Sequence, residues 1–225
     1  LPSTNITGIL GGVTYPILSK IQNDDKRLIA VYRKYIAITS MVIFFGMLLL
    51  AALAKPFIIA VLTEKWANSI IFLQIFCFAL MFDHLCQLNL NILYVKGRSD
   101  LVLRLEVIKK TISISMIIAA IPFGVLAICI ARAIYTQIAV IINTYYTGKL
   151  YGLGYFEQVR DFIRYLLFSF VAVAPSFALS FTAIHPILIL LIGGASACAI
   201  YWFLLRKDSN LLELVTLCKS HLFGK

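Results

Sequence analysis

Long apolar runs divide the chain into segments of membrane-spanning length, each bounded by charged residues or by Pro and Gly. About 20 apolar residues, rising 1.5 Å each, cross about 30 Å of hydrocarbon as a helix, and none of the runs alternates like a barrel strand. The runs cover residues 35–62, 66–94, 107–121, 125–146, 163–184 and 186–205. The pattern therefore predicts an all-α, polytopic membrane helix bundle with six full transmembrane helices.

The connectors between these runs predict how the helices pair. Those at 63–65, 122–124 and 185 are very short, whereas the others are longer and basic, so we expect three tight hairpins. A further apolar run at 6–18 is rich in Gly and interrupted by Pro16, which makes it too short to cross the bilayer alone. It is interpreted as one partial N-terminal helix.

Composition agrees with a membrane protein. The 225 residues are 61% apolar and 13% charged, with a mean hydropathy of +0.94, whereas soluble domains contain about 25% charged residues. Of the 20 Lys and Arg residues, Lys55 and Lys65 lie on one side and Arg132 lies within a span, which leaves 17 on the other side. Because basic residues resist translocation, that side and the C-terminus are predicted to be cytoplasmic. The net charge of +10 then reflects topology and contact with membrane lipids, not nucleic-acid binding.

Two segments have the pattern of amphipathic helices that lie on the membrane surface. Residues 148–162 form an amphipathic elbow in which Tyr155 and Phe162 share an apolar side, although an amphipathic connector between spans fits as well. Residues 206–225 form an amphipathic tail, with Ser209 as its expected N-cap and Leu211 on its apolar face.

No signature of an enzyme is present in the sequence. There is no phosphate-binding glycine loop, and the five cysteines lack metal-ligand spacing, so we interpret them as structural. The acidic pair Asp24 and Asp25 is followed by two basic residues and is expected to cap a helix in solvent. The sequence thus predicts no catalytic residues, no metal and no cofactor.

Three stretches, LPSTNITGILGGVTYPILSKIQNDDKRLIAVYRKYI, LTEKWANSIIFLQIF and ILYVKGRSDLVLRLEVIKK, carry a resemblance to a known family. In this order, from Leu1 to about Lys110, the chain resembles the Wzx-like polysaccharide and lipopolysaccharide flippases of the multidrug, oligosaccharidyl-lipid and polysaccharide exporter superfamily. Its more specific elements are Tyr15-Pro16, Lys65-Trp66 and Gly97-Arg98.

The resemblance implies a two-lobe architecture of which this chain is the C-terminal half. The implied units are a C-terminal lobe lacking its first helix (1–147), the amphipathic elbow (148–162), an additional helical hairpin (163–205) and a cytoplasmic amphipathic tail (206–225).

The implied activity is the flipping of a polyprenyl-diphosphate-linked oligosaccharide across the bacterial cytoplasmic (inner) membrane by alternating access, for cell-envelope polysaccharide biosynthesis. A lipid-linked oligosaccharide, membrane lipids and a polysaccharide polymerase or ligase are the implied partners. The residues alone leave two alternatives open. These are an ion-coupled exporter of small amphipathic cations and a noncatalytic scaffold of an envelope-synthesis complex.

A polar stripe within the span 66–94 is the first candidate site. At 100° per residue, Asp83, His84, Gln87 and Asn91 fall within about a 100° arc of one helix face. A carboxylate at mid-bilayer costs about 2.5 to 3.5 kcal/mol, so Asp83 should face a cavity, face a partner or stay protonated. The stripe is interpreted as the lining of a substrate cavity, with a hydrogen-bonded contact between helices as the alternative.

Arg132 is the second candidate, because guanidinium groups suit phosphate. It shares a helix face with Thr136 and Asn143 and lies seven residues after Val125, about 10 Å below the outer surface. Snorkelling to that surface or pairing with a helix-end carbonyl are alternatives. Since Asp83 lies near the middle of its own span, we expect no direct pair between Asp83 and Arg132.

Overall fold

The computed structural model describes residues 15–182 and 184–212, and every regular element in these ranges is helical. The all-α fold class is therefore confirmed. In chain order the elements are α2 (Asp25–Ala52), α3 (Ala54–Leu62), η1 (Glu64–Ser69), α4 (Ile70–Leu80), α5 (Asp83–Val95), α6 (Ser99–Ala120), η2 (Ile121–Phe123), α7 (Val125–Tyr151), α8 (Tyr155–Leu179) and α9 (Pro186–Leu205).

Among the described residues, five helical stretches are long and apolar enough to cross a membrane, which confirms a polytopic bundle. They are Asp25–Ala52, Glu64–Val95, Val125–Tyr151, Tyr155–Leu179 and Pro186–Leu205. Six full spans were predicted, and the run at 107–121 is the one that falls short. It belongs to α6, where Arg104, Glu106, Lys109 and Lys110 leave only residues 111–120 as a long stretch without a charged side chain.

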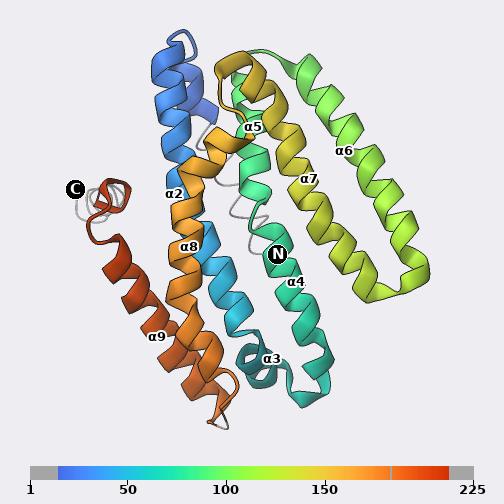
Figure 1. The fold of residues 1–225 in the computed structure, drawn as a ribbon, viewed down its shortest axis with the longest axis vertical. Helices are drawn as coiled ribbons and strands as arrows, with labels where there is room; N and C mark the ends of the chain where they lie inside the picture. Colours follow the sequence, from blue (N-terminus) through green and yellow to red (C-terminus); the bar gives the residue numbers. More distant parts are fainter. Residues whose placement is uncertain (1–14, 183, 213–225) are drawn as a thin grey trace.

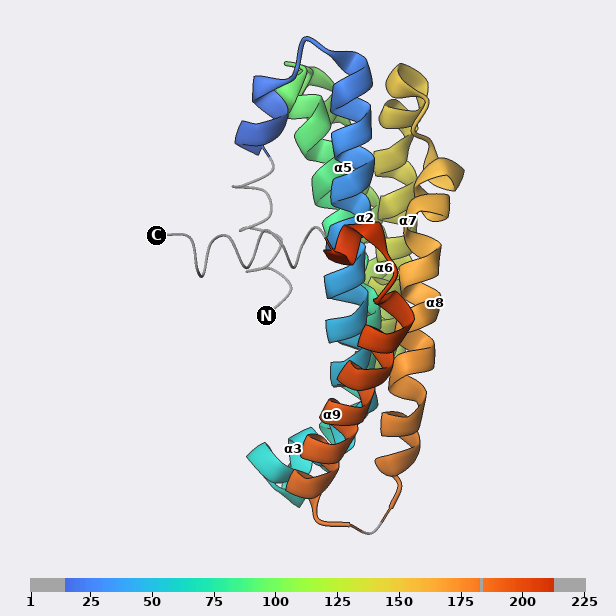
Figure 2. The ribbon, with the colours of Figure 1, turned by 90° about the vertical axis from the view of Figure 1, so that its left-hand side faces the viewer.

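The helices pair along the chain in the expected way (Figure 1). α6 packs on α7 and α8 packs on α9, while α4 and α5 return alongside α2. α2 also packs along α8, and α4 and α5 also pack on α7, so the bundle runs from α9 at one side to α6 at the other. Figure 2 shows that the bundle is thin when it is viewed from the side and that α9 lies beside α2 and α8.

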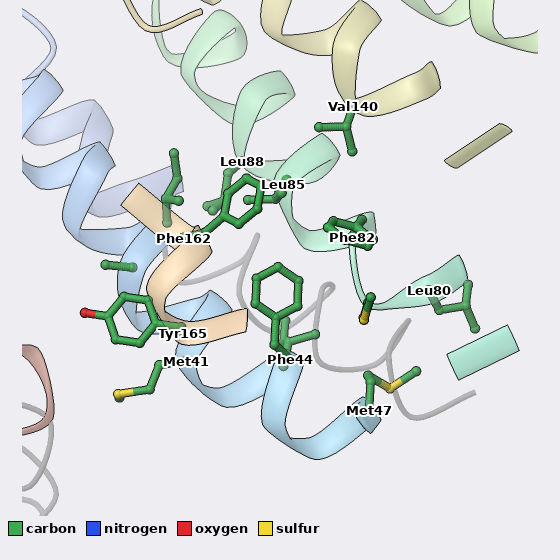
Figure 3. Packing of buried hydrophobic residues seen from close by; sticks show 14 of the residues in the cluster. Met41, Phe44, Met47, Leu80, Phe82, Leu85, Leu88, Val140, Phe162 and Tyr165 are labelled. Atoms are coloured by element: carbon green, nitrogen blue, oxygen red, sulfur yellow. The ribbon is translucent and has the colours of Figure 1, made fainter. Parts of the chain in front are cut away.

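Aromatic rings form the centre of the core (Figure 3). Phe44 of α2 lies edge-on to Phe82 at 5.3 Å and to Phe162 of α8 at 5.6 Å between ring centroids. Edge-to-face pairs of this kind add stabilisation to the burial of large apolar area. The contacts join α2, α8 and the junction between α4 and α5 at one point.

The two amphipathic segments are only partly as expected. Residues 148–162 are divided between the end of α7 and the first two turns of α8, with the left-handed Gly152 (φ +70°) between them, and Phe162 is buried in the core. In the tail, the side chain of Asp208, not Ser209, caps the helical turn, because its Oδ1 accepts from the Asn210 amide at 2.8 Å. The rest of the tail (213–225) and most of the partial helix (6–18) lie outside the described residues.

Small residues bring α8 and α9 close together. The Ser176 hydroxyl of α8 donates to the Gly193 carbonyl of α9 at 2.7 Å. A Cβ placed on Gly193 would lie 3.0 Å from Leu53 and 3.4 Å from the Ser176 Cβ, whereas one on Gly194 would meet nothing within 4 Å. Small side chains at such crossings let membrane helices pack through their backbones.

We expect Gly193→Val to destabilise the bundle by about 1 to 3 kcal/mol, because the added methyl groups overpack this crossing. Thermal unfolding of the detergent-solubilised chain measures the change, with Gly194→Val as the matched control. Equal melting temperatures for the two variants would contradict the close packing of α8 on α9.

Candidate functional site

The Glu64–Val95 span is broken in its middle, where Met81 and Phe82 separate α4 from α5. The Leu85 amide donates to the Phe82 carbonyl, three residues back, at 3.1 Å. The Met81 carbonyl instead accepts a 2.8 Å hydrogen bond from the His84 ring at Nδ1. Because hydrocarbon offers no water to such a carbonyl, His84 repairs the break that it adjoins.

His84 also fixes the break to α2. Its Nε2 lies 2.9 Å from the Ser40 hydroxyl, and both side chains are buried. Since a carbonyl can only accept, Nδ1 carries the hydrogen, and in the neutral ring Nε2 accepts from Ser40. The structure therefore turns His84 toward α2 and away from the helices that Asp83 faces.

Asp83 faces α7 and forms an ion pair with Arg132. The Arg132 Nη2 lies 3.5 Å from the Asp83 Oδ2, and the two side chains are 36% and 27% exposed. Asp83 occupies the first turn of α5, where the helix dipole favours a negative charge. The guanidinium also lies over the Tyr135 ring, 5.3 Å from its centroid.

The expectation that Asp83 and Arg132 do not pair is wrong. That expectation took the turn before α7 as the outer membrane surface and counted the depth of Arg132 from it, as if the turns of all hairpins lay at the same height in the bundle. Figure 1 shows that the turn between α6 and α7 lies well short of the level that α3 and η1 reach. Arg132, seven residues after Val125, therefore comes within 3.5 Å of Asp83 at the break between α4 and α5.

α6 adds two charged residues to this region. The Lys109 ammonium bonds the Glu106 carboxylate, and the Lys109 side chain is only 7% exposed. Lys109 lies close enough for its charge to act on Asp83. Sequence reasoning counted Lys109 among the cytoplasmic charges, because position relative to a span does not show which way a lysine turns.

Amide side chains complete the site. The Gln87 Nε2 donates to the Asn91 Oδ1 at 3.3 Å. Asn91 is buried, and its Nδ2 has no hydrogen-bond partner among the described residues; the same holds for both amide atoms of buried Asn143, which lies beside Cys86. Buried groups without partners are unusual and suit an additional ligand or water.

We use the term polar cluster for the side chains gathered between α5, α6 and α7. Its members are Asp83, Gln87, Asn91, Glu106, Lys109, Arg132 and Asn143. Of the predicted site residues, His84 and Thr136 do not join it. The buried Thr136 hydroxyl donates to the Arg132 carbonyl of its own helix at 3.0 Å. Among the described residues, no group of three or more His, Cys, Asp or Glu could hold a metal ion.

A second buried amide network, missed from the sequence, lies on α5, α7 and α8. Asn89 and Gln158 exchange two hydrogen bonds of 2.9 Å, and the Thr147 hydroxyl donates to the Asn89 Oδ1 at 2.7 Å. Gln158 also donates to the Leu153 carbonyl at 2.9 Å. The signal was the spacing of Gln158, four residues before Phe162 and thus on the same apolar face.

These features define a polytopic helical membrane protein with a charged and amide-lined cluster beside a broken span. Residues 1–71 match the family described as "Polysaccharide biosynthesis protein". Over 116 residues the chain is 31% identical to an "uncharacterized membrane protein in cps region" of Klebsiella pneumoniae, an alignment that covers 52% of this chain. The chain spans about a quarter (24%) of that relative's length. No solved structure matches the chain.

The comparisons confirm the broader part of the predicted resemblance, a likeness to polysaccharide biosynthesis proteins of the membrane. The family match lies at the start of this chain, over α2, α3, η1 and the first residues of α4. The polar cluster lies after it in sequence.

We expect Gln158→Leu to lower the free energy of unfolding by about 1 to 3 kcal/mol, because Asn89 would remain buried with fewer partners. Gln137→Leu is the matched control. The Gln137 Nε2 is buried without a partner among the described residues, beside an apolar groove, so its removal should cost nothing. Thermal unfolding in detergent compares the two, and a greater loss for Gln137→Leu would contradict the network.

Proposed function

We propose that this chain is part of a transporter that flips a polyprenyl-diphosphate-linked oligosaccharide for cell-envelope polysaccharide biosynthesis. The carrying observation is the polar cluster, in which Asp83 and Arg132 meet at the break of a membrane span. Transporters commonly place substrate sites where spanning helices are discontinuous, near the bilayer midplane. The family match and the relative in a cps region support the link to polysaccharide.

The chemistry of the polar cluster suits a diphosphate and a sugar. Arg132 contacts Asp83 through one nitrogen only and is partly exposed, so its other N–H groups stay free for phosphate oxygens. Gln87 and Asn91 supply amide groups on the same side of α5 for sugar hydroxyls. A phosphate that binds Arg132 would compete with Asp83 for the guanidinium. The Asp83–Arg132 ion pair would then break when substrate binds and form again when substrate leaves, once in each transport cycle.

Charge balance argues against an exporter of cations. The polar cluster has two carboxylates, and each faces a cation: Asp83 faces Arg132, and Glu106 faces Lys109. A site for cationic substrates needs an excess of negative charge, which these pairs do not provide. A scaffold, the other alternative, needs no charged residue at this depth, where each one is costly.

The membrane topology belongs to the same proposal. In it the basic loops and the C-terminus face the cytoplasm of a bacterium, and the lipid tail of the substrate stays in the inner membrane while its diphosphate enters the polar cluster. A polysaccharide polymerase or ligase would receive the flipped product.

Three variants of the Asp83–Arg132 ion pair test the proposal: two that remove one residue each and one that removes both. Asp83→Leu or Arg132→Leu leaves one charge without its partner, whereas the double variant leaves none and should insert and fold normally. We expect all three, placed in the full-length protein, to lose at least about 90% of surface polysaccharide, since removing a charged hydrogen bond from a site costs more than tenfold in binding. Surface polysaccharide and cytoplasmic-leaflet lipid-linked oligosaccharide are measured in a strain lacking the gene.

The control is a matched ion pair at the surface. Arg98 donates two hydrogen bonds to Asp100, of 3.1 and 3.2 Å, and these lower the pKa of Asp100, so this carboxyl stays ionised. The double variant Arg98→Leu with Asp100→Leu should export normally. If the Asp83 and Arg132 double variant also exports normally at wild-type membrane levels, the pair serves only helix packing and the flippase site is wrong.

A further inference from the structure

A second polar cavity lies on other helices, away from the polar cluster. It has a volume of about 340 Å³ and is formed by α2, α8 and the turn after α9. Its basic side chains are Arg33 and Lys34 of α2 and Arg160 and Arg164 of α8, and Asn210 closes it from the chain after α9. We call it the basic pocket.

The basic pocket lies where a membrane span ends. α9 is 20 residues long and has no charged residue, and it is followed at once by Arg206 and Lys207. The chain then turns toward α2 (Figure 2) and brings Asn210 against Tyr165 of α8, with the Asn210 Nδ2 2.8 Å from the Tyr165 hydroxyl. Residues that directly follow an apolar span lie at the depth of lipid headgroups.

Ion pairs hold the basic side chains in fixed positions. Arg33 forms a two-pronged pair with Asp161, with its Nη2 2.6 Å and its Nε 2.9 Å from the carboxylate oxygens. Arg164 pairs with the buried carboxylate of Asp208, which the Tyr165 hydroxyl also approaches at 3.3 Å.

Asp161 and Asp208 are thus paired with Arg33 and Arg164. Arg160 is exposed and has no ion pair among the described residues, so it keeps its donors for a ligand.

We propose that the basic pocket binds a phosphate group at the membrane surface, either in an anionic lipid headgroup or as soluble phosphate. Guanidinium forks match phosphate oxygens, and basic pockets between membrane helices are typical sites for anionic headgroups. A phosphate there would bridge α2 and α8 beside the end of α9. The proposal does not depend on flipping, because none of these residues belongs to the polar cluster.

Native mass spectrometry of the delipidated 225-residue chain tests the site. Phosphatidylglycerol and phosphatidylcholine with identical acyl chains are titrated separately, and we expect the anionic lipid to bind preferentially. Arg160→Gln should weaken phosphatidylglycerol binding by about fivefold, the effect of one basic residue near a membrane surface. Arg160→Lys, which keeps the charge, should retain most of the affinity.

Arg104→Gln is the matched control, because Arg104 is also exposed and without an ion pair among the described residues, but lies on α6. Excess inorganic phosphate then distinguishes the sources. If inorganic phosphate displaces phosphatidylglycerol, phosphate alone is enough to occupy the basic pocket. If phosphatidylglycerol stays bound, the basic pocket is a site for a lipid headgroup. Both outcomes support the proposal. Equal weakening by Arg160→Gln and Arg104→Gln, or no preference for phosphatidylglycerol, would overturn the proposal.

Discussion

The structure depends on how one broken span satisfies its backbone in a medium without water. Between α4 and α5 the Met81 carbonyl loses its regular helical partner, and His84 supplies the replacement while its other nitrogen meets Ser40 of α2. An unsatisfied carbonyl in hydrocarbon costs several kcal/mol, so the bond to Met81 holds the His84 ring at the break, and the bond from His84 to Ser40 fixes α5 against α2. Because successive helical residues point 100° apart, the same arrangement turns Asp83 toward α7.

The charges that meet there explain why α6 can remain polar at membrane depth. Glu106 and Lys109 satisfy each other on α6, and the Lys109 side chain is buried beside Asp83. α6 could not cross a bilayer as an isolated helix with these charges, but packed on α7 it turns Lys109 inward. The turn between α6 and α7 stops well short of the level that α3 and η1 reach (Figure 1), and Arg132 of this displaced hairpin pairs with Asp83 at the break.

Hydropathy predicted the helical bundle and the pairing of its helices, because apolar length and connector length are local properties of the sequence. The Asp83–Arg132 pair could not be predicted in this way, since it depends on how far one hairpin is displaced along another. Lys109 and Gln158 were missed for a related reason: each lies in a segment of mixed polarity, where only tertiary packing decides which side is buried. The cap of the tail differs by one residue, because Asp208 and Ser209 are both good N-caps and the end of α9 selects between them.

Two groups of helices meet at the broken span. In the first group, α8 packs on both α2 and α9, and the Tyr201 hydroxyl of α9 donates to the Met41 carbonyl of α2 at 2.6 Å. The basic pocket lies in this group. α6 and α7 form the other group and hold Lys109 and Arg132. The break at Met81 and Phe82 is bonded to the first group through His84 and to the second through Asp83. In the proposed transport cycle, alternating access would require one group to move against the other, and a discontinuous helix that is tied to both is where such a movement would change the fewest backbone hydrogen bonds.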